Sequence, residues 1–292
     1  MKKISAVVLS LILLISAGAS CFAANTAAYN KGERNIVLTD SSDLYIEISD
    51  YGFEPMNNEY TVEMLIVNKT GIPIEYGTDY AAVNGYIVNS YMYGVCAADR
   101  RDICYLEIIS DDIYNLGLDA PDVISFHIYV NLTEESGNRE LYADDVTLNV
   151  SGRSLSDSPT RTFEDFPSEL TYCNEFIRFV VYDAKQVEGS PFYQLDCVAE
   201  NPNQFDITLN CSNMNVDGIY TEPYWLCRIP TGYRILTSIF IDEEELAVYG
   251  VTDFDHISFS LMIYEGFPNL WDTENTSQPF FAYPLSFFPA KG

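Results

Sequence analysis

The stretch Val83-Asn84-Gly85, followed downstream by Asp122-Val123-Ile124-Ser125-Phe126, decides the fold because it occurs twice. The second occurrence is Val216-Asp217-Gly218, followed by Asp255-His256-Ile257-Ser258-Phe259. One constant offset relates all paired positions of the block. The same offset also relates Gly117 to Gly250 and, further upstream, Asn68 to Asn201. A fixed offset over this length indicates a duplicated structural unit. We therefore predict two tandem copies of one domain.

The chain has 292 residues, which is enough for two domains with separate cores. We place the first repeat at 35–151, a Ser-, Arg- and Pro-containing linker at 152–172, and the second repeat at 173–289. Residues 1–24 have the pattern of a secretory signal peptide, with two lysines ahead of a short apolar run. We expect a secreted protein without a transmembrane anchor, and the alternative is a lipid anchor at Cys21.

Short segments of alternating polar and apolar residues predict β-strands throughout both copies. The dipeptides Asn84-Gly85 and Asp217-Gly218 predict tight hairpins, because both residue types tolerate positive φ. Each copy also has one short helical pattern that ends at a glycine; Ser110 is the expected cap in copy one. The acidic run 242–245 fits a helix start better than a metal site, because it lacks the ligand spacing of a calcium loop. The fold class predicted is all-β: two tandem antiparallel β-sandwiches, each with one short helix.

The block resembles an uncharacterised immunoglobulin-like repeat domain of secreted proteins and lipoproteins of Gram-positive bacteria. The resemblance rests on the turn Asn84-Gly85-Tyr86, a polar hairpin, a short acidic helix ending in Gly, and the strand Ile124-Ser125-Phe126. It is weaker in the second copy, where Ile219 replaces Tyr86. The resemblance implies an immunoglobulin-like fold and supplies no functional residues.

The formal net charge is −28. Such a field repels phosphate backbones, so we expect no nucleic-acid partner. The partner predicted is an extracellular protein or glycan, and the charge itself favours solubility outside the cell.

The cysteines offer disulfide candidates, because an exported protein can form them. Cys96 and Cys104 flank a polar turn, as do Cys197 and Cys211, and Cys173 and Cys227 are left over. Buried free thiols are the alternative. No pattern of Cys and His residues predicts a zinc site.

Nothing in the sequence predicts catalysis or a cofactor. The two histidines, His127 and His256, are not equivalent positions, and His127 lies within an apolar strand where packing explains it. Asp122 and Asp255 could be imagined as a carboxylate pair, but their shared register before an Ile-Ser-Phe strand fits a turn or capping role. We expect a non-enzyme.

Aromatic side chains give the best candidates for binding. Tyr91 and Tyr93 are predicted to alternate on one strand face, and Tyr224, Trp225 and Trp271 come from the second copy. Exposed rings can stack on sugars or anchor a protein, whereas buried rings belong to the core. We therefore predict a secreted, non-catalytic binding or surface-interaction protein. The alternative is a carbohydrate-binding module with an aromatic platform.

Overall fold

The computed structural model describes residues 28–29, 35–134, 137–158, 160–223, 225–268 and 277–289. The predicted signal peptide 1–24 and Cys21 lie outside these ranges. Among the described residues, no helix has the length and apolar character needed to cross a membrane.

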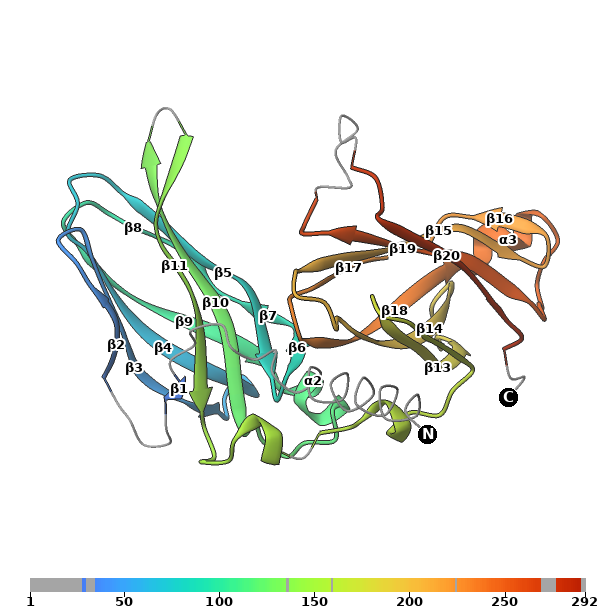
Figure 1. Ribbon diagram of the computed structural model, residues 1–292, viewed down its shortest axis with the longest axis horizontal. Coiled ribbons are helices and arrows are strands. Elements are labelled where there is room, and N and C mark those ends of the chain that lie inside the picture. The colour runs from blue at the N-terminus through green and yellow to red at the C-terminus, as the bar shows by residue number, and fades with distance from the viewer. Residues whose placement is uncertain are drawn as a thin grey trace, which may run out of the picture.

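The first repeat is a sandwich of two sheets (Figure 1). One sheet has the order β2-β3-β4-β9-β7, with β2 at Ile36–Asp40, β3 at Leu44–Glu54, β4 at Glu59–Asn68, β9 at Arg101–Ile109 and β7 at Ser90–Tyr91. The facing sheet has the order β11-β10-β5-β6, with β11 at Gly137–Asn149, β10 at Val123–Glu134, β5 at Ile74–Val83 and β6 at Tyr86–Val88. Strand β8 (Tyr93–Cys96) pairs with β5, and β1 (Ala28–Tyr29) adds in parallel to β11.

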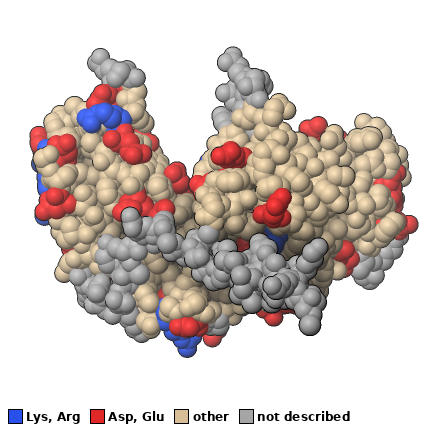
Figure 2. Space-filling view, viewed as in Figure 1, with Lys and Arg blue, Asp and Glu red and all other residues tan. Residues whose placement is uncertain are grey.

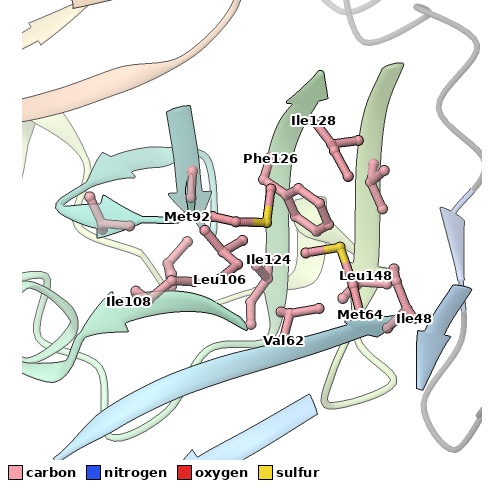
Figure 3. Close-up of a cluster of buried hydrophobic side chains, with 14 of the residues drawn as sticks. Ile48, Val62, Met64, Met92, Leu106, Ile108, Ile124, Phe126, Ile128 and Leu148 are labelled. Carbon is pink, nitrogen blue, oxygen red and sulfur yellow. The ribbon is translucent and has the colours of Figure 1, made fainter. Parts of the chain in front are cut away.

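Strict alternation in the strands produces the core between the sheets. On β3 the buried side chains are Leu44, Ile46 and Ile48, with partly exposed residues between them. Since strand side chains alternate between faces, this pattern leaves one apolar face on each sheet. Figure 3 shows the two faces meeting, with Met64 of β4 close to Phe126 of β10.

The second repeat has the same arrangement. Its first sheet contains β12 (Leu170–Cys173), β13 (Arg178–Gln186), β14 (Phe192–Glu200) and β18 (Arg234–Asp242). Its second sheet contains β16 (Ile219–Thr221), β15 (Ile207–Val216), β19 (Ile257–Glu265) and β20 (Phe281–Phe287), with β17 (Leu226–Ile229) paired to β15. Strand β12 begins inside the stretch 152–172 that the sequence assigned to the linker.

Equivalent side chains make equivalent hydrogen bonds in the two repeats. The Asn68 amide donates to the carbonyls of Ile72 and Cys96, at 2.8 and 3.2 Å. At the positions related by the offset, the Asn201 amide donates to the carbonyls of Phe205 and Ile229, both at 2.9 Å.

The predicted hairpins are present and are braced in the same way in both repeats. The backbone amides of Asp122 and Val123 donate to Asn84 Oδ1, at 3.0 and 2.9 Å. Those of Asp255 and His256 donate to the Asp217 carboxylate, both at 2.9 Å. The duplication deduced from the sequence is therefore a duplication of structure.

Among the described residues, each repeat has one short helix, as predicted. Helix α2 spans Ser110–Asn115 and α3 spans Glu243–Val248, and Gly117 and Gly250 follow them with positive φ. The expected capping role of Ser110 is wrong: Ile109 occupies the N-cap position, and the Ser110 hydroxyl is buried without a partner. In α3 the Asp242 side chain accepts from the amides of Glu244 and Glu245, which agrees with a helix start in the acidic run.

The two repeats share one sheet, which the sequence did not indicate. Strand β6 of the first repeat pairs in parallel with β18 of the second, Tyr86 opposite Arg234 and Ile87 opposite Ile235. The result is a ten-stranded sheet that runs through both units. Each unit keeps its own apolar core, but Val180 and Val198 of the second repeat pack with the core of the first.

The described part of the linker packs against the same junction. It forms two 3-10 turns, η1 (Leu155–Asp157) and η2 (Phe163–Asp165). Phe166 is buried, and its ring centroid lies 4.9 Å from that of Tyr182. The Tyr86 hydroxyl donates to the carbonyl of Arg161 at 2.7 Å. The two immunoglobulin-like β-sandwiches are therefore joined by main-chain pairing and by packing.

All six described cysteines are free, so the disulfide candidates are not formed. Cys96 lies on β8, which pairs with β5, whereas Cys104 lies on β9, which pairs with β4. Cys197 and Cys211 are likewise in different sheets, because the turn between β14 and β15 crosses the sandwich. Cys173 is exposed and Cys227 is buried. The alternative of buried thiols describes the other five, and burial raises the pKa of Cys104 to about 12.

Candidate functional site

A cleft of about 800 Å³ lies where the two repeats meet. The first repeat contributes the end of β6 and helix α2, and the second contributes the outer face of β13, β14 and β18. The principal lining residues are Ile87, Val88, Asn89, Asp112, Leu116, Arg161, Tyr182, Asp183, Lys185, Gln194, Asp196, Leu236, Ser238 and Phe240. Because the lining comes from both units, the cleft exists only through the β6–β18 junction.

A polar cluster on the second repeat forms one wall of this cleft. Strand pairing places Lys185 opposite Gln194 and Asp196 opposite Ser238, so their side chains meet on one face. Lys185 Nζ lies 2.6 Å from Asp183 and 2.7 Å from Asp196. The Ser238 hydroxyl donates to Asp196 at 2.7 Å, and the Gln194 amide donates to the same carboxylate.

These contacts fix the charges of the cluster. Burial alone would raise the pKa of Asp196, but hydrogen bonds from Lys185, Gln194 and Ser238 outweigh burial and hold it below its usual value. Hydrogen bonds to Asp183 and Asp196 raise the pKa of Lys185. The lysine is therefore a cation and Asp196 an anion at neutral pH, and neither is poised to exchange a proton with a ligand.

The opposite wall belongs to the first repeat. The Asp112 carboxylate of α2 accepts a hydrogen bond from the backbone N–H of Asn89 at 2.6 Å. Arg161 of the linker lies over the Phe166 ring, 5.3 Å from its centroid. The cleft thus combines carboxylates, two cations, neutral amide and hydroxyl groups, and apolar edges from Leu116 and Phe240. This composition suits a polar ligand held by several hydrogen bonds.

His127 lies in a second polar cluster, outside the residues that line the cleft. Its Nδ1 is 2.9 Å from Asp145, and its Nε2 is 3.7 Å from Asp79. The hydrogen bond with Asp145 raises the pKa of His127. The Tyr80 hydroxyl also donates to Asp145 at 2.9 Å, and the Tyr80 ring contacts Tyr233 of the second repeat. Both imidazole nitrogens face carboxylates, an arrangement that stabilises the imidazolium.

Of the aromatic residues predicted to bind a ligand, the three that the structure describes do not form one platform. Tyr91 and Tyr93 are exposed, but β7 and β8 belong to different sheets, so these rings do not alternate on one strand face as predicted. Trp225 is buried, and its indole N–H donates to Thr237 at 2.9 Å, so it is a core residue and not a binding residue. Tyr224 and Trp271 lie outside the described residues.

Asp122 and Asp255 have the scaffold role that their shared register predicted. Both donate backbone N–H groups to the turn residue of the preceding hairpin. The carbonyl of Asp122 also accepts from Val150 at 2.8 Å. In the described part of the chain, no group of three or more His, Cys, Asp or Glu side chains is arranged to hold a metal ion.

Sequence patterns alone do not predict the residues of the cleft. The only local signal is a polar alternation, in which Gln194 and Asp196 occupy one face of a strand otherwise rich in apolar residues. The pairing of two distant strands with Lys185 and Ser238 is needed to turn this alternation into a cluster.

Comparisons with known proteins leave the family open. No family model matches the chain, and no curated protein matches it. Among solved structures, similar chains include a Porphyromonas gingivalis W83 protein of unknown function, at 11% identity and a TM-score of 0.21, covering 75% of this chain and 92% of that one. A Salmonella enterica SafA pilin in complex with the SafB chaperone matches at 11% identity and a TM-score of 0.25, covering 85% and 97%. The periplasmic chaperone SfaE matches at 6% identity and a TM-score of 0.24, covering 75% and 92%. Similarity this low carries no functional argument.

Proposed function

We propose that this protein is a secreted, non-catalytic binding protein whose ligand site is the cleft between its two repeats. The observation that carries the proposal is the cluster of Lys185, Gln194, Asp196 and Ser238 on a cleft wall that faces α2 of the other repeat. Sites between two rigid units commonly bind ligands, because groups from both sides can converge on one molecule.

The chemistry of the cleft narrows the class of ligand. Lys185 is already neutralised by two aspartates, so it offers no free charge to an anion. The molecule as a whole carries −28, which disfavours polyanions. A neutral or cationic ligand rich in hydroxyl or amide groups, such as a glycan or an extended peptide segment of an extracellular protein, fits these conditions.

A glycan array and a displayed peptide library, each probed with the mature protein, test the proposal. Gln194→Ala removes an amide from the cleft wall, and Gln186→Ala, on an exposed glutamine of the same sheet, is the matched control. We expect a retained glycan or peptide to lose at least about tenfold in affinity with Gln194→Ala and to be unchanged with Gln186→Ala. Ligands bound equally by both variants, or no ligand at all, would contradict a site in this cleft.

A second candidate, carbohydrate binding on an aromatic surface, is supported by a different observation. Tyr93, Gly77 and Tyr129 lie in a row across β8, β5 and β10. A side chain at Gly77 would collide with Tyr129, since a Cβ there would lie 2.5 Å from its hydroxyl oxygen. The Tyr129 ring thus lies against the sheet beside the exposed Tyr93, as a sugar-stacking surface requires. Tyr129→Ala should abolish glycan retention at this surface, and Tyr114→Ala, on the exposed face of α2, should not.

A further inference from the structure

The junction between the repeats is a heterologous contact, made by two different surfaces of one kind of unit. The first repeat contributes the free edge of β6 and the adjoining α2, and the second contributes the edge and outer face of β18. The Arg234 amide donates to the Gly85 carbonyl at 3.0 Å, and the Arg234 guanidinium lies over the Tyr86 ring. Leu236 and Val198, on the outer face, pack with the core of the first repeat. Because the repeats are equivalent, the first repeat has its own counterpart of the β18 surface, and the second has its own counterpart of the β6 surface. Neither counterpart takes part in the junction.

The first repeat retains the counterpart of the β18 surface, which we call the β9 surface: Leu65, Arg101 and Ile103. By the repeat offset these residues correspond to Val198, Arg234 and Leu236. Among the described strands, β9 pairs with β7 only near Ile108, so its edge at Arg101 is open. Ile103 is 55% exposed, whereas Leu236 is partly buried against the core of the first repeat. An apolar residue is thus exposed at the position where the second repeat needs one for docking.

The second repeat retains the counterpart of the β6 surface, which we call the β16 surface: Tyr220, Thr221, Val248 and Tyr249. These residues correspond to Ile87, Val88, Asn115 and Leu116, all of which line the cleft between the repeats. Tyr220, Val248 and Tyr249 are 73%, 81% and 63% exposed. Tyr220 and Thr221 also line an open groove of about 480 Å³. This surface lies at the end of the second repeat that faces away from the first (Figure 1).

We propose that the protein associates head to tail, with the β16 surface of one copy docking on the β9 surface of the next. The partner is a second copy of this chain. The β9 surface corresponds to the β18 side of the internal junction and the β16 surface corresponds to its β6 side, so the two surfaces are expected to fit each other. In the proposed contact, β9 of one copy pairs with β16 of the next in the register that β18 and β6 have within one chain. This register places Arg101 opposite Ile219, and the backbone N–H of Arg101 donates to the Gly218 carbonyl, as that of Arg234 donates to Gly85. Gly218 holds this carbonyl in the same left-handed turn as Gly85, with φ of 93° and 84°. Arg101 keeps the positive charge of Arg234 and meets an end that carries Glu222 and Glu245.

A contact of this kind is open-ended, since both surfaces remain free at the ends of the assembly. Each new junction also lacks two features of the internal one: Ile219 replaces Tyr86, and no linker is shared. The association is therefore reversible and depends on concentration.

Sedimentation velocity over a concentration series of the mature protein tests the proposal. The wild type should form species that grow with concentration. Ile103→Glu and Tyr220→Glu should each weaken self-association at least about tenfold, because a buried charge replaces an apolar contact. Met56→Glu, at a residue that is 91% exposed in the turn between β3 and β4, is the matched control and should behave as the wild type.

Mixing the two variants distinguishes head-to-tail association from a symmetric dimer. Ile103→Glu keeps an intact β16 surface, and Tyr220→Glu keeps an intact β9 surface, so an equimolar mixture should form a one-to-one dimer and nothing larger. Ile103→Ser and Tyr220→Ser repeat the experiment without an added charge, and circular dichroism confirms that each variant is folded. A wild type that stays monomeric at every concentration, variants that self-associate as strongly as the wild type, or a mixture that forms no dimer would each overturn the proposal.

Discussion

At the scale of single residues, one buried asparagine in each sandwich links its two sheets by hydrogen bonds. Asn68 and Asn201 are almost fully buried, and each amide donates to main-chain carbonyls on both sides of a chain crossing. A buried carbonyl that loses its donor has neither a protein nor a water hydrogen bond, and this lowers the stability of the folded state. This explains why the same amide side chain stands at both positions.

We expect Asn68→Ala and Asn201→Ala each to lower the free energy of unfolding by about 1–3 kcal/mol, the cost of leaving buried acceptors unpaired. Urea denaturation followed by circular dichroism measures the change. Asn138→Ala, on an exposed part of β11, provides the reference. If the buried variants unfold at the same urea concentration as this reference, the amides do not stabilise the fold.

His127 makes part of the stability depend on pH. Its pair with Asp145 raises its pKa above that of the unfolded chain, while the same hydrogen bond lowers the pKa of Asp145 and keeps it ionised. Asp79 and Glu140 are the other carboxylates that favour the imidazolium. The His127–Asp145 pair therefore stabilises the folded protein fully at pH values below about 6.5, the pKa of histidine in the unfolded chain. This stabilisation is lost as the pH rises through the raised pKa of His127 in the folded protein.

His127→Gln should accordingly destabilise the protein more at about pH 5.5 than at about pH 8.5, by about 1 kcal/mol, a typical net value for an intramolecular hydrogen bond. Thermal or urea unfolding at the two pH values gives the comparison. Asn138→Ala, at an exposed residue of β11 that does not titrate, should show no such difference. A loss for His127→Gln that is equal at both pH values would indicate packing alone.

At the scale of elements, the tight hairpins are the features that local sequence specifies best. Asn84 and Gly85 have φ of 50° and 84°, and Asp217 and Gly218 have 46° and 93°. A β-carbon is disfavoured at such angles, so the Asn-Gly and Asp-Gly dipeptides are sufficient to predict both turns. The alternation in β3 is equally local, since one buried face is all that it requires.

Gly85→Ala and Gly218→Ala should each cost about 1–2 kcal/mol, because the new side chain forces a left-handed backbone conformation on a chiral residue. Little else opposes them: a Cβ at Gly218 has no neighbour within 4 Å, and one at Gly85 meets only Leu155 at 3.8 Å. Gly71→Ala has equal space and no positive φ, so its free energy of unfolding should stay near that of the wild type. Equal stability in all three variants would show that the turns tolerate alanine.

Features that depend on the pairing of distant strands could not be predicted in the same way. Cys96 and Cys104 are close in sequence around a polar turn, but the strands that carry them pair with different partners. The polar cluster in the cleft needs the β13–β14 and β14–β18 registers together, including the bulge between Val181 and Asp183. Periodicity fixes which face a residue takes, and it contains no information on which strand lies beside it.

At the scale of the whole molecule, one sheet contains strands of both repeats and so connects the two sandwiches (Figure 1). A constant offset in the sequence identifies the two repeats, but it does not predict the contacts between them. Such contacts join different surfaces of the two repeats and occur once in the chain, so they leave no repeated pattern. On the face shown in Figure 2, acidic side chains are spread over both units and basic ones are few, as the composition of 43 Asp and Glu against 15 Lys and Arg leads one to expect. Repulsion between the units therefore opposes the junction, and packing must outweigh it.

Phe166 supplies much of that packing. Its ring is only 5% exposed, and it fills the space between Tyr182 and the guanidinium of Arg161. Phe166→Ala should cost about 3–5 kcal/mol, as for a buried phenylalanine in a core, and the loss should fall on the junction. We expect the variant to unfold in two calorimetric transitions where the wild type shows one, because each repeat keeps its own core. Phe53→Ala, at a ring that is 43% exposed on β3, should keep the single transition. A single transition in Phe166→Ala as well would mean that the β6–β18 pairing couples the repeats without help from the linker.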